Sequence, residues 1–132
     1  MGGKEKTDKK SVAVVVEDEK HIEDFLRFLL ERQGYRVFSA SDGVKGYDLI
    51  KTQRPHLVIT DLMLPEMDGF TILRNMRQEP GLAGTRVFVM SAYSASDSTR
   101  QLIMDQPNVS GILSKPIRKE DLLAKLGKVE EK

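Results

Sequence analysis

Two uninterrupted apolar runs constrain the fold of this chain most. Residues 12–16 (Val-Ala-Val-Val-Val) and 57–60 (Leu-Val-Ile-Thr) are rich in β-branched side chains and contain almost no polar ones. A strand with one face in water alternates apolar and polar residues, whereas a continuous apolar run indicates a strand that is covered on both faces. Such strands belong mainly to parallel sheets with helices on either side. The two runs therefore predict an α/β domain.

Patterns typical of strands and helices alternate along the chain. Strand patterns occupy residues 12–16, 35–40, 57–60, 86–91 and 111–114. Apolar residues at helical spacing follow each strand: Ile22, Phe25, Leu26, Leu29 and Leu30; Val44, Tyr47 and Ile50, after a cap at Ser41 or Asp42; Phe70, Leu73 and Met76; Leu102 and Ile103 within 94–105; and Leu122, Leu126 and Val129 after about residue 118. This alternation predicts five parallel strands with five helices on the two faces. We expect the strand at 35–40 to lie at an edge.

The composition limits the classes of protein to which the chain can belong. Its 132 residues suit one domain, which we place at 11–130, after a Gly- and Lys-rich segment at 1–10 that we expect to be disordered. The net charge of +1 gives no bulk attraction to nucleic acid or membranes. There is no Cys, no run of roughly 18 apolar residues and no signal pattern. We expect a cytoplasmic protein without direct nucleic-acid or membrane contact.

Three carboxylates are predicted to meet at one edge of this sheet. Glu17 and Asp18 follow the first strand, and Asp61 follows the third. The carboxyl ends of parallel strands share a rim, which is where open α/β sheets bind ligands. Three acids there repel one another unless a cation joins them. Mg²⁺ binds oxygen ligands, commonly one or two carboxylates with a phosphate. Together with Lys115, which follows the fifth strand, it would balance the three negative charges.

The same rim carries the groups that phosphoryl transfer requires. An Asp carboxylate such as Asp61 is a competent nucleophile toward phosphorus. The transfer depends mainly on positioning and on neutralisation of charge, which Lys115 and the metal could provide. The hydroxyl of Ser91, at the end of the fourth strand, could donate a hydrogen bond to a phosphoryl oxygen. Met63 could add its backbone carbonyl to the metal, because its sulfur does not suit a hard cation.

Four motifs, in order along the chain, resemble those of the response-regulator receiver domain of two-component systems. They are Val-Val-Glu-Asp-Glu at 15–19, Asp-Leu-Met-Leu-Pro-Glu-Met-Asp-Gly at 61–69, Met-Ser-Ala at 90–92 and Lys-Pro-Ile at 115–117. The resemblance covers about residues 11–128. It implies a flavodoxin-like, doubly wound sheet with strand order 2-1-3-4-5.

The resemblance also implies a role for each rim residue. Asp61 would be the phosphoacceptor and, with Asp18 and the backbone carbonyl of Met63, a ligand of Mg²⁺. Glu17 would act on the metal through water, and Mn²⁺ is expected to substitute for Mg²⁺. Ser91 would be the switch hydroxyl, Ala92 would leave room for the phosphoryl group, and Lys115 would pair with it. The Lys115–Pro116 bond would be cis.

As a member of this family the chain would be a regulatory phosphoacceptor and not an enzyme. Its phosphodonor would be a sensor histidine kinase or a histidine phosphotransfer protein. A downstream effector would read the phosphorylated state on the face formed by the fourth helix, the fifth strand and the fifth helix. We expect Tyr93, two residues after Ser91, to lie beside the site and to shield the acyl phosphate from water.

One departure and two rival functions bear on this interpretation. Position 112, three residues before Lys115, is Ile where the family often has an aromatic switch residue, so an aromatic readout is not expected at that position. A haloacid-dehalogenase-type hydrolase would need an Asp two residues after the nucleophile, where this chain has Met63. A receiver-like interaction module that works without phosphorylation would be favoured by loss of the acidic pair, Asp61 or Lys115. All of these residues are present.

Overall fold

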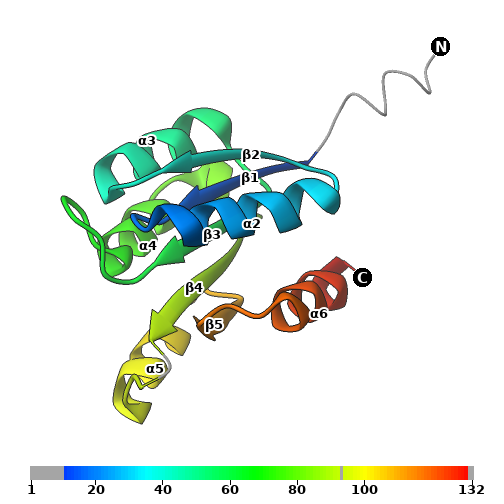
Figure 1. The fold of residues 1–132 in the computed structure, drawn as a ribbon. Helices are drawn as coiled ribbons and strands as arrows, with labels where there is room; N and C mark the ends of the chain where they lie inside the picture. The colour runs from blue at the N-terminus through cyan, green and yellow to red at the C-terminus, as the bar shows by residue number, and fades with distance from the viewer. Residues whose placement is uncertain (1–10, 93, 131–132) are drawn as a thin grey trace.

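The computed structural model describes residues 11–92 and 94–130, and the segment at 1–10 that we expect to be disordered lies outside this part. Five parallel strands form one sheet in the order β2-β1-β3-β4-β5 (Figure 1). They are β1 (Ser11–Val16), β2 (Tyr35–Ala40), β3 (Leu57–Asp61), β4 (Arg86–Ala92) and β5 (Gly111–Lys115). The strand order and the edge position of β2 confirm the predicted doubly wound fold.

Helices cover both faces of the sheet. They are α2 (Lys20–Arg32), α3 (Gly43–Gln53), α4 (Gly69–Arg77), α5 (Asp97–Met104) and α6 (Lys119–Glu130), with a short 3₁₀ helix, η1 (Pro80–Leu82), after α4. Apolar residues of α2 and α6 pack on one face of the sheet, and those of α3, α4 and α5 pack on the other. None of the helices that the structure describes has the length and apolar composition needed to cross a bilayer.

The central strands contribute to two separate cores. In β1, Ala13 and Val15 pack beneath α2, whereas Val14 and Val16 pack beneath α3, and all four side chains are fully buried. Successive side chains of a strand point to opposite faces, so a strand between two helical layers needs apolar residues at every position. The continuous apolar runs are therefore explained by the two cores.

The structure differs from the helix predictions in two respects, the buried faces of α2 and α3 and the start of α5. Phe25 and Val44 were both expected on buried helix faces, but they are 38% and 49% exposed. In α2 the buried face is centred on Leu26, Leu29 and Leu30, which leaves Phe25 at its border. In α3 the buried residues are Gly43, Gly46 and Ile50. Gly46 approaches Val16 of β1 and Gly43 approaches the backbone of Met67, and this face of the helix turns Val44 toward solvent.

The start of α5 is the second difference. The helix was expected from residue 94 but begins at Asp97. The side chain of Ser96 accepts a hydrogen bond from the backbone N–H of Thr99, at 3.1 Å, and so caps the first turn. The chain before Ser96 is therefore free to form the turn that follows β4.

The close approach of α3 to β1 generates a stability prediction. A Cβ atom at Gly46 would lie 2.6 Å from Cγ1 of the buried Val16, so Gly46→Ala must push the helix away from the sheet or distort the Val16 side chain. Overpacking of this kind costs about 1–3 kcal/mol of unfolding free energy. Urea denaturation followed by circular dichroism measures it.

Gly127→Ala in α6 is the matched control. A Cβ atom there would meet nothing within 4 Å, and Ala is about 1 kcal/mol better than Gly inside a helix. This variant should be as stable as the unaltered chain or more so. Equal stability of Gly46→Ala and Gly127→Ala would contradict the packing described for α3.

Candidate functional site

Three acidic side chains meet at the carboxyl edge of the sheet. Asp61 is the last residue of β3, and Glu17 and Asp18 directly follow β1, which pairs with β3 through Val16 and Thr60. One carboxylate oxygen from each acid lies within 4.8 Å of the other two. Glu17 and Asp61 are only 2% and 7% exposed, whereas Asp18 is open to solvent. The fold thus assembles the predicted acidic cluster from two neighbouring strands.

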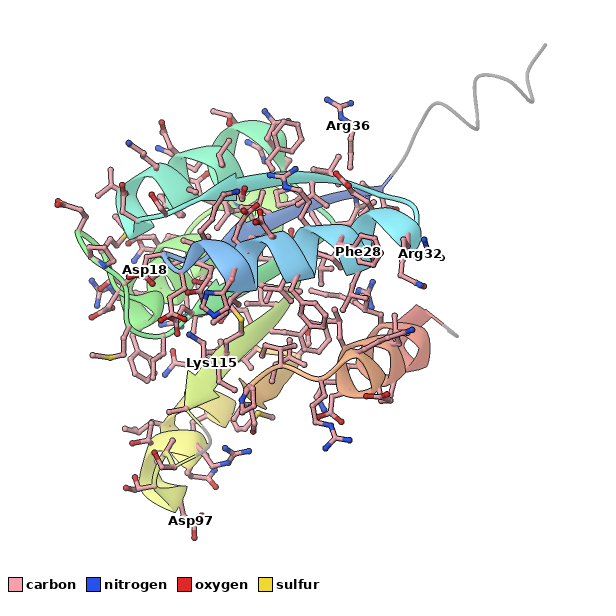
Figure 2. The ribbon with its side chains drawn as sticks, viewed as in Figure 1. Asp18, Phe28, Arg32, Arg36, Asp97 and Lys115 are labelled. Carbon is pink, nitrogen blue, oxygen red and sulfur yellow. The ribbon has the colours of Figure 1, made fainter. Side chains whose placement is uncertain are left out.

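Lys115 supplies the positive charge in this cluster. It is the last residue of β5, two strands away from β3, and its ammonium reaches 3.1 Å from Oδ2 of Asp61 and 3.2 Å from Oε1 of Glu17. Figure 2 shows Asp18 and Lys115 at the end of the sheet where α2 begins. The Lys115–Pro116 peptide bond is cis, as the resemblance implied. One ammonium therefore bridges two carboxylates of different strands.

Backbone N–H groups fix the two buried carboxylates. The N–H of Leu62 donates to Oδ1 of Asp61 at 2.8 Å, and the N–H of Glu19 donates to Oε2 of Glu17 at 2.8 Å. The remaining oxygen of each acid faces Lys115. At Asp61 this contact is a hydrogen bond, but Oε1 of Glu17 is buried without an aligned hydrogen bond. The position of both carboxylates is therefore set, and Oε1 of Glu17 has an ion-pair contact with Lys115 but no hydrogen bond.

Burial and charge shift the ionisation of the two partners. Burial raises the pKa of Glu17, and the nearby charge of Asp61 adds to this, while the Glu19 N–H and Lys115 oppose it. Burial by itself would lower the pKa of Lys115, but its hydrogen bond to Asp61 and the charges of Asp61 and Glu17 outweigh that effect and raise it. Lys115 is therefore a stable cation, and Glu17 is the acid whose charge needs further compensation.

The cluster fits a hard divalent cation. Its donor atoms are all carboxylate oxygens, the ligand type that Mg²⁺ prefers. Three carboxylates face one ammonium, which leaves two negative charges for a cation to balance. Such an ion could contact Oε1 of Glu17, which has no hydrogen bond, and the carboxylate of Asp18. Because Asp18 is exposed, the ion could also keep water ligands. Glu17, Asp18 and Asp61 are thus the residues that could hold it.

Acids farther along the edge already have partners. Glu23 is buried and receives hydrogen bonds from Nε of Arg27 at 3.0 Å and from the Ser39 hydroxyl at 2.7 Å. Asp24 accepts one from Lys20 at 2.7 Å. The Ser39 contact joins α2 to the edge strand β2, and the Arg27 and Lys20 contacts within α2 give both acids a cationic partner. Glu23 and Asp24 therefore belong to a structural network and not to the neighbouring cluster of Glu17, Asp18 and Asp61.

A hollow lies beside Asp61, and Glu17 is not among the residues that line it. Its lining residues are Asp61, Leu62, Met63, Ser91, Ala92, Ala95, Thr99 and Lys115. Ser91 is buried and 3% exposed, Ala92 is exposed, and the Met63 side chain is 75% exposed. The structure therefore brings Met63, Ser91 and Ala92 to Asp61 and Lys115, as predicted. The expected position of Tyr93 lies outside the described residues.

Four contributors to the site were not predicted. The backbone N–H groups of Leu62 and Glu19 donate hydrogen bonds to the Asp61 and Glu17 carboxylates, and a pattern of side chains does not predict such backbone contacts. Ala95 and Thr99 line the hollow because α5 lies beside the carboxyl end of β4 (Figure 1). The weak apolar pattern of 94–105 gave no basis for orienting that helix. A signal was present only in the spacing of Ser96 and Thr99, which sets the start of α5.

Comparisons with known proteins agree with this geometry. The family model of the response regulator receiver domain matches residues 13–127. The DNA-binding dual master transcriptional regulator RpaA of Synechocystis sp. is 32% identical over 113 residues, which are 86% of this chain and 46% of RpaA. The chain thus spans about half the length of this curated relative.

Solved structures share the fold over nearly the whole chain. A putative response regulator from Chloroflexus aurantiacus has a TM-score of 0.84 at 22% identity, covering 94% of this chain and 100% of that one. The chemotaxis response regulator CheY4 of Vibrio cholerae has a TM-score of 0.82 at 25% identity, covering 92% and 99%.

A third solved structure of the same fold contains a metal ion. The receiver domain of the sensor histidine kinase PA1611 from Pseudomonas aeruginosa has magnesium coordinated in its active-site cleft. It has a TM-score of 0.79 at 22% identity, covering 91% of this chain and 97% of that one. With the family match over residues 13–127 and the acidic cluster at the carboxyl edge of the sheet, this chain belongs to the response regulator receiver domain family.

Proposed function

We propose that this chain accepts a phosphoryl group on Asp61 in a Mg²⁺-dependent reaction, and that the phosphorylated form signals to a partner protein. The observation that carries the proposal is the placement of Asp61. Its carboxylate accepts hydrogen bonds from the Leu62 N–H and from the Lys115 ammonium, the latter at 3.1 Å. One of its oxygens lies within 4.8 Å of a carboxylate oxygen of Glu17 and of Asp18, so that one metal ion could contact all three acids. A nucleophile, a cation and a place for a metal therefore meet at the Asp61 carboxylate.

The proposed donor is a phosphohistidine of a sensor histidine kinase or of a histidine phosphotransfer protein. An oxygen of Asp61 attacks phosphorus, the bond from phosphorus to the imidazole nitrogen breaks, and the imidazole leaves after taking up a proton. Lys115 moves from its contact with the carboxylates to the incoming phosphoryl oxygens. A bound Mg²⁺, or Mn²⁺ in its place, would supply further positive charge to those oxygens. Asp18 and the Met63 carbonyl would hold the ion, with Glu17 acting through water.

The other residues of the hollow suit the detection of the phosphoryl group. Ser91 would donate its hydroxyl to a phosphoryl oxygen, and the small Ala92 leaves room for that group beside it. Phosphorylation of the ionised Asp61 makes the site more negative by about one charge and adds strong hydrogen-bond acceptors. The response would spread to α5, β5 and α6, where Leu102 and Met104 are 56% and 47% exposed and available to an effector protein. No direct contact with nucleic acid or membrane is proposed.

Phosphorylation of Asp61 is tested directly by mass spectrometry. The chain is incubated with Mg²⁺ and acetyl phosphate or phosphoramidate and weighed intact. We expect one adduct of about 80 Da, the mass of a phosphoryl group. The adduct should be absent when Mg²⁺ is chelated and absent in Asp61→Asn.

Asp68→Asn serves as its control. The Asp68 side chain caps α4 by accepting a hydrogen bond from the Thr71 N–H, and an Asn side chain can do the same. This variant should be phosphorylated like the unaltered chain. An adduct that persists in Asp61→Asn would rule out Asp61 as the acceptor.

Metal binding can be measured without phosphorylation. Mg²⁺ that binds only the folded state raises the melting temperature by an amount that grows with the logarithm of its concentration divided by its Kd. We expect Asp18→Asn to weaken binding about tenfold or more, since loss of even an indirect contact to a metal has an effect of that size. Asp24→Asn, which removes an acid paired with Lys20, should bind Mg²⁺ normally. Equal Mg²⁺ responses of both variants would exclude Asp18 as a ligand.

Lys115→Met should leave the buried acids without their cation. In metal-free buffer at neutral pH we expect a loss of about 1–3 kcal/mol of unfolding free energy, less than for a fully buried ion pair because the Lys115 side chain is 24% exposed. The gain in stability on adding Mg²⁺ should be larger than in the unaltered chain. The pKa of Glu17, already raised by burial, would rise further in this variant. Its folded state then binds a proton more tightly than the unfolded chain, so the deficit should grow as pH rises from acidic to neutral.

Lys119→Met is the control, because Lys119 is exposed at the start of α6. Stability is measured by urea denaturation across the pH range. If the deficit of Lys115→Met is independent of both pH and Mg²⁺, the proposed charge balance is wrong.

A further inference from the structure

One wall of the hollow beside Asp61 comes from α5 and the turn before it. Ala95 and Thr99 line the hollow together with Leu62 and Met63, which follow β3. Thr99 lies in the first turn of α5, where its N–H is capped by the Ser96 hydroxyl. Any displacement of this turn away from the sheet would therefore widen the hollow beside Asp61 and Ser91.

The first turn of α5 has little apolar contact to hold it. Ile103, near the carboxyl end, is the one buried residue among Asp97–Met104, and its neighbours Leu102 and Met104 are 56% and 47% exposed. Figure 2 places Asp97, the first residue of the helix, at the periphery of the molecule. Polar contacts must therefore decide where the first turn lies.

Arg100 provides such a contact. Its guanidinium donates a hydrogen bond to the hydroxyl of Ser114 in β5 at 3.3 Å. Among the hydrogen bonds between described residues, this is the one that joins a side chain of α5 to the sheet. Ser114 lies directly opposite Ser91 in the pairing of β4 with β5. The contact is thus made next to the proposed switch hydroxyl.

The opposite end of α5 is fixed to a different element. Arg77 of α4 donates to the side chain of Gln106 at 2.8 Å, and the Asn108 amide donates to the backbone carbonyl of Leu73 at 3.2 Å. Both contacts lie in the segment that follows the helix. The carboxyl end of α5 is therefore anchored to α4, and its first turn is held on β5 by Arg100.

We propose that the Arg100–Ser114 hydrogen bond holds the first turn of α5 against the hollow and thereby sets the lifetime of the phosphoryl group on Asp61. This inference rests on the proposed function. In hydrolysis, a water oxygen attacks phosphorus, the bond from phosphorus to the Asp61 oxygen breaks, and the carboxylate leaves with the electron pair. Both hydrogens of the water end on inorganic phosphate. Arg100 is a positioning residue in this step. It holds Thr99 in place, and Thr99 forms the wall of the hollow that limits the access of water to the phosphoryl group.

The half-life of the adduct after removal of acetyl phosphate is the quantity to measure. Arg100→Met removes the donor and Ser114→Ala removes the acceptor, and each should shorten the half-life about threefold or more. A threefold change corresponds to about 0.6 kcal/mol, the low end of the net contribution of one hydrogen bond. The double variant should be no faster than either single one, because both changes remove the same contact. Arg100→Lys keeps a donor and should recover part of the lifetime.

Arg77→Met separates this effect from a general loosening of α5. It removes the contact with Gln106, which lies at the other end of the helix and does not line the hollow. Its half-life should match that of the unaltered chain even where its melting temperature falls. An equal shortening in Arg77→Met, or additive effects of Arg100→Met and Ser114→Ala, would overturn the inference.

Two failures are distinguishable in the same experiment. A normal adduct with unchanged half-lives in Arg100→Met and Ser114→Ala would overturn the role of the hydrogen bond and leave Asp61 as the phosphoacceptor. Absence of any adduct on the unaltered chain would overturn both proposals. The small change Ser114→Ala keeps the test valid where Arg100→Met does not fold.

Discussion

The pairing of Lys115 with two buried carboxylates is the interaction on which the site depends. Glu17 and Asp61 are 2% and 7% exposed, and a buried acid without a cation costs several kcal/mol. Lys115 reaches them because the completed sheet places the carboxyl end of β5 at the same edge as the carboxyl end of β3, two strands away. The three residues come from distant parts of the chain, so the charge balance forms only when the whole α/β fold has formed. Fold and site are therefore stabilised together.

The same pairing makes the site responsive to added charge. The Leu62 and Glu19 N–H groups hold one oxygen of each carboxylate, independently of Lys115. The ammonium can therefore change partners while the acids stay in place. Burial raises the pKa of Glu17, and a cation between the acids would oppose this by stabilising the ionised carboxylate. A phosphoryl group would give Lys115 a partner of higher negative charge. Neither change requires the central strands to move.

The sequence predicted most of what depends on the sheet and little of what depends on helix orientation. Continuous apolar runs located β1 and β3, and the acids at their ends followed, because parallel strands share a rim. The family resemblance, rather than the residues themselves, supplied the strand order. The exposure of Val44 depends on how closely Gly46 approaches β1, a distance that periodicity does not contain. The roles of Thr99 and Ser114 depend on the placement of α5, whose apolar pattern is weak, so tertiary contacts decided them.

The absence of an aromatic at position 112 becomes understandable from these contacts. Ile112 is half-buried and packs against the core beneath α4 and α5. An aliphatic side chain there has no polar tip that could alternate between core and solvent. Ser114, two residues farther along β5 and on the same face, instead meets Arg100 of α5 and lies opposite Ser91. A shift of Ser91 toward a phosphoryl group would thus reach α5 through a directional hydrogen bond, which breaks over a short displacement, rather than through the rotation of a packed ring.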